Sequence, residues 1–183
     1  MSFVRFATAR ALFESYPEVE TKIGVAPTDH PPIDFAKGLL SSGKLADALT
    51  FCAYLLPRRE AVWWACTSVR TLHPDIQRED ADGLRAAEAW VATPDDDHRR
   101  AALAIGASGD TSRPATWLAL AAGWSGGVET SGAKQVPIPA YMTARAARIA
   151  VFLSAAKVGS SRRQSGMQSS IVEGIRLAET GLG

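Results

Sequence analysis

Apolar side chains recur along this chain with the spacing of amphipathic helices. The clearest case is the stretch at residues 55–70, LLPRREAVWWACTSVR. Four of its apolar residues fall at positions i, i+3, i+4 and i+7, which is one face of a helix. They are Val62, Ala65, Cys66 and Val69. The stretch therefore predicts a central helix, with Pro57 at its first helical position and an end just before Pro74.

Further apolar stripes predict the other helices. They lie at residues 1–16, 33–40, 45–56, 84–91, 94–106, 114–124, 142–153 and 167–178. Asp80 or Asp82 can cap one of them, and Thr93 can cap the next, with Pro94 at its first position. No segment has the alternating β-branched pattern of a strand. We therefore predict an all-α fold of roughly eight helices in stacked antiparallel pairs, as a helical bundle or a short solenoid-like array.

The prolines and glycines indicate where the chain is connected loosely. Residues 17–32 hold four of the ten prolines, which is typical of an extended connection. We therefore divide the chain into residues 1–32, a short N-terminal helix with a Pro-rich connection, and residues 33–183, a helical domain. A second Gly/Ser/Pro-rich segment, residues 125–139, predicts a long loop. By contrast, the helix at 45–56 leads straight into the central helix, so these two should form an antiparallel hairpin or a sharp corner.

The overall composition excludes several classes of protein. The net charge is +1, which provides no general attraction for nucleic acid or for an anionic membrane surface. No apolar run approaches the ~18 residues that a membrane span requires, and the N-terminus lacks the apolar core of a secretory signal. We therefore expect a cytoplasmic protein with no nucleic-acid partner and no membrane insertion. The apolar content permits a homodimer without requiring one.

The residue types used in catalysis form no recognisable site. His30, His73 and His98 are far apart, with no cysteine or histidine beside them at metal-ligand spacing. Cys52 and Cys66 lie on apolar faces, which favours buried thiols over a disulfide between adjacent helices, and over reactive nucleophiles. We therefore predict no catalytic residue, no metal site and no cofactor.

Two charged segments have simpler interpretations than a binding site. The segment 159–163, Gly-Ser-Ser-Arg-Arg, precedes a predicted helix and could hold an anion there, but a solvated loop is the favoured interpretation. The acidic run at residues 95–97 suits the positive end of a helix dipole.

The central helix supplies the candidate partner surface. Trp63 lies beside the apolar face, whereas Trp64 points toward polar neighbours, so Trp64 is either a core residue or part of a groove that receives a partner. Arg59 precedes Trp63 by four residues, so its guanidinium can lie near the indole. The predicted surface comprises Arg58, Arg59, Trp63, Trp64 and Arg70, and the loop at 125–139 is a second candidate. For Trp63, Trp90 and Trp117, core packing is the favoured interpretation.

Two segments of the chain carry a family resemblance. LLPRREAVWWAC and VPIPAYMTARAARIAVFLSAA resemble segments of an uncharacterised bacterial family of small helical proteins, over about residues 33–182. Some members of that family are encoded near type VI secretion genes. The resemblance therefore implies a bacterial cytoplasmic protein with an accessory role in secretion, and it implies no catalytic residue.

Together these patterns favour a non-catalytic protein–protein interaction module, a helical adaptor or accessory factor whose partner is another protein. The alternative is an enzyme or a small-ligand-binding protein that uses a pocket between helices. In that case Arg58, Glu60 and His73 are the polar groups expected to line the pocket. An immunity-type protein that blocks a toxin shares the sequence features of the adaptor.

Overall fold

The computed structural model describes residues 4–74, 76, 78–131 and 134–182. Across these residues the chain forms helices and one short β-hairpin. In chain order the elements are α1 (Ala9–Ser15), the 3-10 helix η1 (Pro17–Val19), α2 (Pro32–Ser41), α3 (Leu45–Leu55), α4 (Arg58–Leu72), α5 (Arg78–Ala92), α6 (Asp96–Ser108), α7 (Pro114–Gly123), β1 (Val128–Ser131), β2 (Lys134–Pro137), α8 (Tyr141–Ala156) and α9 (Ser160–Thr180). The predicted all-α class is confirmed.

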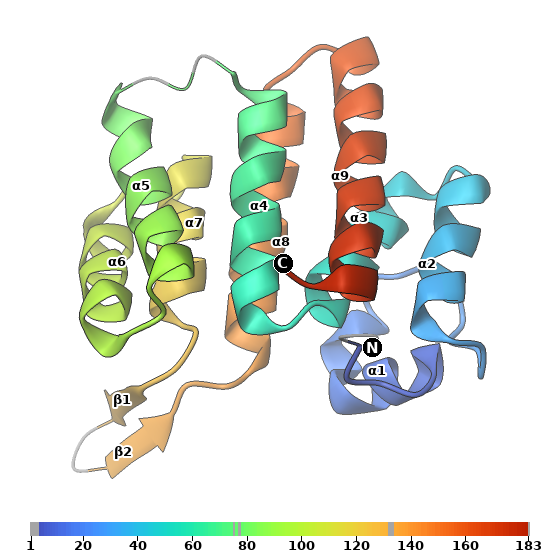
Figure 1. Cartoon of the computed structure of the whole chain (residues 1–183), viewed down its shortest axis with the longest axis horizontal. Helices are drawn as coiled ribbons and strands as arrows, with labels where there is room; N and C mark the ends of the chain where they lie inside the picture. The colour runs from blue at the N-terminus through green and yellow to red at the C-terminus, as the bar shows by residue number, and fades with distance from the viewer. Residues whose placement is uncertain (1–3, 75, 77, 132–133, 183) are drawn as a thin grey trace.

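The long helices stand in two layers (Figure 1). Helices α5, α4 and α9 form the front layer and pack across onto α7, α8 and α3 respectively. Helix α6 covers α5 and α7 at one end of the array, and α2 packs against α3 and α9 at the other. Helices α3 and α4 barely contact each other, so the tight connection between them is a corner. Most of the pairs that stack across the layers thus join segments that are far apart in the sequence.

One hydrophobic core runs through both layers. Leu12 and Phe13 of α1 belong to the same buried cluster as Phe51 of α3 and Leu118 of α7. Residues on both sides of position 32 therefore share this core, and the division of the chain at that position stays a prediction. Among the described residues, no helix is both long enough and apolar enough to cross a membrane.

The helix starts differ from several sequence predictions. Pro57 occupies the N-cap of α4 rather than its first helical position. Helix α6 begins two residues later than predicted, because Asp95 is the cap and accepts a hydrogen bond of 2.8 Å from the backbone N–H of His98. Asp80 and Asp82 lie inside α5 instead of capping it. In α6 the side chain that reaches an unpaired backbone N–H, that of Asp95, decides where the helix begins.

Residues 128–137 correct the prediction of a long loop without strands. Strands β1 and β2 pair antiparallel, with Val128 opposite Pro137 and Glu129 opposite Val136. Residues 132–133, between the strands, fall outside the described residues. The hairpin extends from the end of α7 and stands away from the helical layers (Figure 1). Its strands are only four residues long and mix polar with apolar side chains, so they show no period-two pattern in the sequence.

The two cysteines are free and buried, as predicted. Burial raises the pKa of the Cys52 thiol to about 12 and also raises the pKa of Cys66. Both side chains therefore remain neutral thiols that pack as small apolar groups.

Candidate functional site

Trp64 lies in the core and not on a partner surface. Its side chain is fully buried, and its indole Nε1 donates a 2.7 Å hydrogen bond to the backbone oxygen of Ser170 in α9. Helix α9 approaches this closely because residue 174 is glycine: a Cβ there would lie 3.0 Å from the Trp64 Nε1. The hypothesis of an open groove at Trp64 is therefore wrong. The polar neighbours of Trp64 suggested solvent, but the last helix covers that face.

Arg58 and Arg59 bind backbone oxygens at the ends of neighbouring helices. The Arg58 Nη1 donates to the Ser125 oxygen just after α7, and the Arg59 Nε donates to the Val91 oxygen in the last turn of α5, both at 2.8 Å. The C-terminal end of a helix carries partial negative charge, so a guanidinium is favourable at either place. These two arginines therefore connect α4 to α7 and α5.

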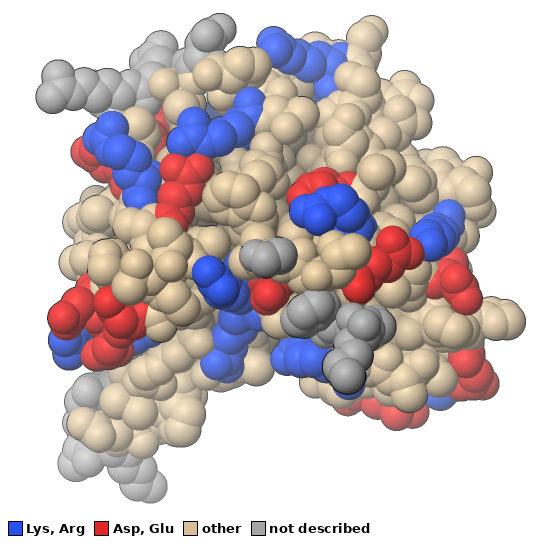
Figure 2. Space-filling model, in the orientation of Figure 1, with Lys and Arg blue, Asp and Glu red and all other residues tan. Residues whose placement is uncertain are grey.

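The other two members of the predicted surface are also engaged within the chain. Arg70 forms a two-point ion pair with Glu88 of α5, at 2.7 and 2.8 Å. Trp63 is half-buried against the core. The cation–π pairs found among the described residues involve Arg5 and Arg148, so the predicted contact of Arg59 with the Trp63 indole is not among them. Arg59 and Arg70 remain exposed. Figure 2 shows acidic and basic side chains interspersed over the face that α5, α4 and α9 form.

Replacing Arg59 should lower stability modestly. Arg59→Met removes the bond to Val91 and should lower the free energy of unfolding by about 1 kcal/mol. Arg59→Glu should cost more, because a carboxylate then faces the negative end of α5. Urea denaturation measures both changes. Arg145→Met, at an exposed position of α8, is the control and should stay within about 0.5 kcal/mol of wild type. Equal stability of all four proteins would contradict the capping role.

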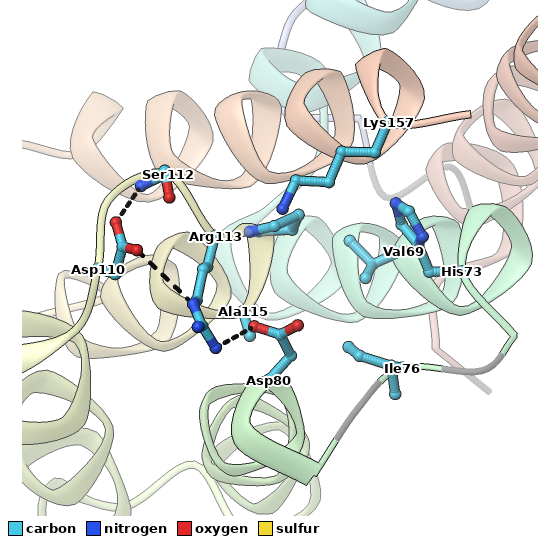
Figure 3. A pocket seen from close by; sticks show the side chains of 10 residues that line it. Val69, His73, Ile76, Asp80, Asp110, Ser112, Arg113, Ala115 and Lys157 are labelled. Carbon is cyan, nitrogen blue, oxygen red and sulfur yellow. Dashed lines mark hydrogen bonds and ion pairs between the residues drawn. The ribbon is translucent and has the colours of Figure 1, made fainter. Parts of the chain in front are cut away.

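A cavity of about 480 Å³ lies at the opposite end of α4 (Figure 3). It opens to solvent and is bordered by the end of α4, the start of α5, the connection between α6 and α7 with the start of α7, and the residue that follows α8. Its lining residues are Val69, His73, Ile76, Asp80, Asp110, Ser112, Arg113, Pro114, Ala115 and Lys157. Polar groups from four chain segments therefore converge on one cavity.

Arg113 holds the two acidic residues of the cavity in place. Its Nη1 lies 3.3 Å from the Asp80 Oδ1, and its Nε lies 3.6 Å from the Asp110 Oδ2. The Asp110 Oδ1 also accepts a 2.8 Å hydrogen bond from the backbone N–H of Ser112. This bond and the positive charges of Arg113 and Lys157 hold the pKa of Asp110 below its ordinary value. Arg113 thus positions both carboxylates at one wall of the cavity.

His73 is the one predicted pocket residue that lines this cavity. Its Nε2 lies 3.1 Å from the backbone oxygen of Ser154, and since a carbonyl only accepts, Nε2 is the protonated nitrogen. The tautomer that carries its proton on Nε2 leaves Nδ1 as an acceptor. Arg58 and Glu60 sit at the other end of α4, which is 15 residues or about 22 Å long. The prediction that these three residues share a pocket is therefore wrong.

The remaining candidate sites take structural roles. Gly159 is the N-cap of α9, and residues 160–163 form its first turn rather than a loop. Arg163 donates back to the backbone oxygens of Ala155 and Val158, at 2.8 and 3.1 Å. The acidic run at 95–97 caps α6 and pairs with its arginines, which confirms the helix-start interpretation. Within the described part of the chain, no cluster of three or more metal-binding side chains occurs.

A family model described as "Family of unknown function (DUF6931)" matches residues 35–178. The chain belongs to this family. Searches among curated proteins and among solved structures found no match. The DUF6931 match begins inside α2 and ends inside α9, so it includes both helix layers, the hairpin and the cavity. The family has no assigned function. Helix α1 lies outside the matched residues.

Proposed function

We propose that this DUF6931 protein is a non-catalytic protein–protein interaction module, an adaptor that binds its partner through the β1–β2 hairpin. The observation that carries this proposal is the exposure of two apolar side chains there. Val128 is 52% exposed and Val136 is 47% exposed, whereas most large apolar side chains of the described chain are buried. Val128 pairs with Pro137, and Val136 pairs with Glu129, so the two valines lie on opposite faces of the hairpin. Because both are exposed, the helices cover neither face of the hairpin at these positions.

The base of the hairpin is held firmly. Arg58 binds Ser125, and the Arg99 Nη1 donates to the backbone oxygen of Gly123 at 3.1 Å. Gly127 adopts φ of +86°, and a Cβ at this position would overlap the Arg99 guanidinium, so glycine suits this tight bend. Beyond the base, a two-stranded hairpin is only marginally stable in water, and both outer edges carry unpaired backbone groups. A rigid base with an incomplete sheet suits the addition of a partner strand.

The chemistry of the hairpin indicates the kind of partner. A polypeptide in extended conformation can add to either edge through backbone hydrogen bonds and place apolar side chains against Val128 or Val136. We place this interaction in the bacterial cytoplasm and infer an accessory role beside a type VI secretion system, with a secretion component or effector as the partner. The support for this setting is the resemblance of the segments around Trp64 and at residues 136–156.

A charge-substitution experiment tests the hairpin as the contact. The chain carries a purification tag and is incubated with an extract of its source organism, and retained proteins are identified by mass spectrometry. Val128→Glu combined with Val136→Glu should reduce recovery of the specific partner at least about tenfold, because charged side chains replace the apolar contacts. The melting temperature should stay unchanged, since both side chains are exposed.

Val172→Glu is the matched control, because Val172 is 57% exposed on α9, away from the hairpin. The control should retain the partner at the wild-type level. Loss of the partner in the control but not in the hairpin variant would assign the contact to α9 and contradict this proposal.

A further inference from the structure

We propose that the cavity at the end of α4 binds a small zwitterion, an amino acid with an aliphatic side chain. This inference goes beyond the hairpin interaction and is independent of it. The cavity lies at one end of the helical layers, and the hairpin lies at the other (Figure 1). Its volume of about 480 Å³ is within the range of about 300–1,000 Å³ that small-molecule sites occupy.

The formal charges of the cavity balance. Lys157 and Arg113 contribute two positive charges, and Asp80 and Asp110 contribute two negative charges. Arg113 lies between the two carboxylates, and together with Lys157 it brings the formal charge of the lining to zero, so the cavity has no excess charge for a polyphosphate or for a multivalent cation. A ligand that has no net charge but carries one ammonium and one carboxylate fits this arrangement better than an anion.

Opposite charges also face the cavity from different sides (Figure 3). Lys157 reaches over it from the end of α8, and Asp80 rises from α5 below. One Asp80 oxygen binds Arg113, and the other is turned toward the side that Val69 and Ile76 line. The Asp80 side chain is only 24% exposed, so its charge is partly shielded from water and acts more strongly on a ligand.

These positions assign a role to each part of the ligand. The carboxylate of an amino acid binds the Lys157 ammonium, and its own ammonium binds the second oxygen of Asp80. The side chain then packs against Val69 and Ile76, both apolar. In the tautomer that donates from Nε2 to the Ser154 oxygen, His73 Nδ1 can accept a further hydrogen bond from the ammonium. All interactions are noncovalent.

Calorimetry with leucine and two of its analogues tests this assignment. Leucine carries both charges, leucinamide carries only the ammonium, and 4-methylpentanoate carries only the carboxylate. We expect leucine to bind in the millimolar range or tighter and to raise the melting temperature, and each analogue to bind about tenfold more weakly. Glycine should also bind more weakly than leucine, since it lacks the apolar contact. Equal binding of leucinamide and leucine would overturn the zwitterion assignment, and so would no binding of leucine.

Two variants test the assigned contacts. Lys157→Met and Asp80→Asn should each weaken leucine binding about tenfold or more, and Asn can still accept the bond from Arg113. Asp82→Asn is the control for Asp80→Asn, because Asp82 lies on the same helix but outside this cavity. Lys157→Met changes an exposed side chain, so it reports on binding even if Asp80→Asn impairs folding. Unchanged leucine affinity in Lys157→Met would overturn the proposed site.

Discussion

Trp64→Ala is expected to unfold the protein or to bring it close to unfolding. The indole is fully buried between α4 and α9, and removing it leaves a large cavity and removes the hydrogen bond to the backbone oxygen of Ser170. Truncation of a buried tryptophan costs about 3–5 kcal/mol, against a total stability of about 5–15 kcal/mol for a typical domain. Urea denaturation followed by circular dichroism measures the loss directly.

Two further variants separate packing from the hydrogen bond. Trp64→Phe keeps most of the ring volume but removes the donor, so it should cost about 1–3 kcal/mol. Trp63→Ala changes the half-buried neighbour and should cost less than Trp64→Ala. If Trp64→Ala unfolded at the same urea concentration as the wild type, Trp64 would not be a core residue, and the packing of α9 over α4 would be wrong.

Gly83→Ala should also destabilise strongly, although alanine is normally the better helix former. Gly83 lies within α5, where exchange to alanine would ordinarily gain about 0.5–1 kcal/mol. Here a Cβ would overlap the Ala115 carbonyl oxygen and lie 2.7 Å from its carbonyl carbon. Because the obstacle is backbone at the start of α7, the helices must separate, at a cost of about 1–3 kcal/mol or more. Thermal unfolding should show a clearly lower melting temperature.

Gly38→Ala is the matched control for this variant. Gly38 is exposed within α2, and nothing lies within 4 Å of the position its Cβ would take. This substitution should therefore follow helix propensity and raise stability by about 0.5–1 kcal/mol. We therefore expect Gly83→Ala to lower the free energy of unfolding and Gly38→Ala to raise it. A gain in both would show that α5 does not pack closely on α7.

The fold class could be predicted from the sequence because it depends on local periodicity. Each amphipathic stripe needs only its own residues, so the α4 face through Val62 and Val69 was identifiable without neighbours. What covers a second face depends on distant segments. Gly174 admits α9 against Trp64 from 110 positions away, and no local pattern around Trp64 contains that information. Only the structure could therefore decide whether Trp64 is a core residue or part of an open groove.

The candidate sites were harder to predict for the same reason. The cavity unites His73, Asp80, Arg113 and Lys157, which are spread over four segments without motif spacing. The sequence predicts Arg58 as part of a partner surface, but its bond to the Ser125 oxygen depends on how α4 and α7 meet. The segment 125–139 was recognised as a candidate contact from its composition. Its strand pairing was missed, because four-residue strands give too short a pattern.

Hydrogen–deuterium exchange of the hairpin amides, with and without the captured partner, tests the adaptor account most directly. Strand addition gives the outward-facing amides of residues 128–131 and 134–136 new hydrogen-bond partners. We expect these amides to exchange rapidly in the free chain and to become protected in the complex, while the amides around His73 remain unchanged. A hairpin that still exchanges rapidly in the complex, with protection appearing only on another surface, would contradict the account.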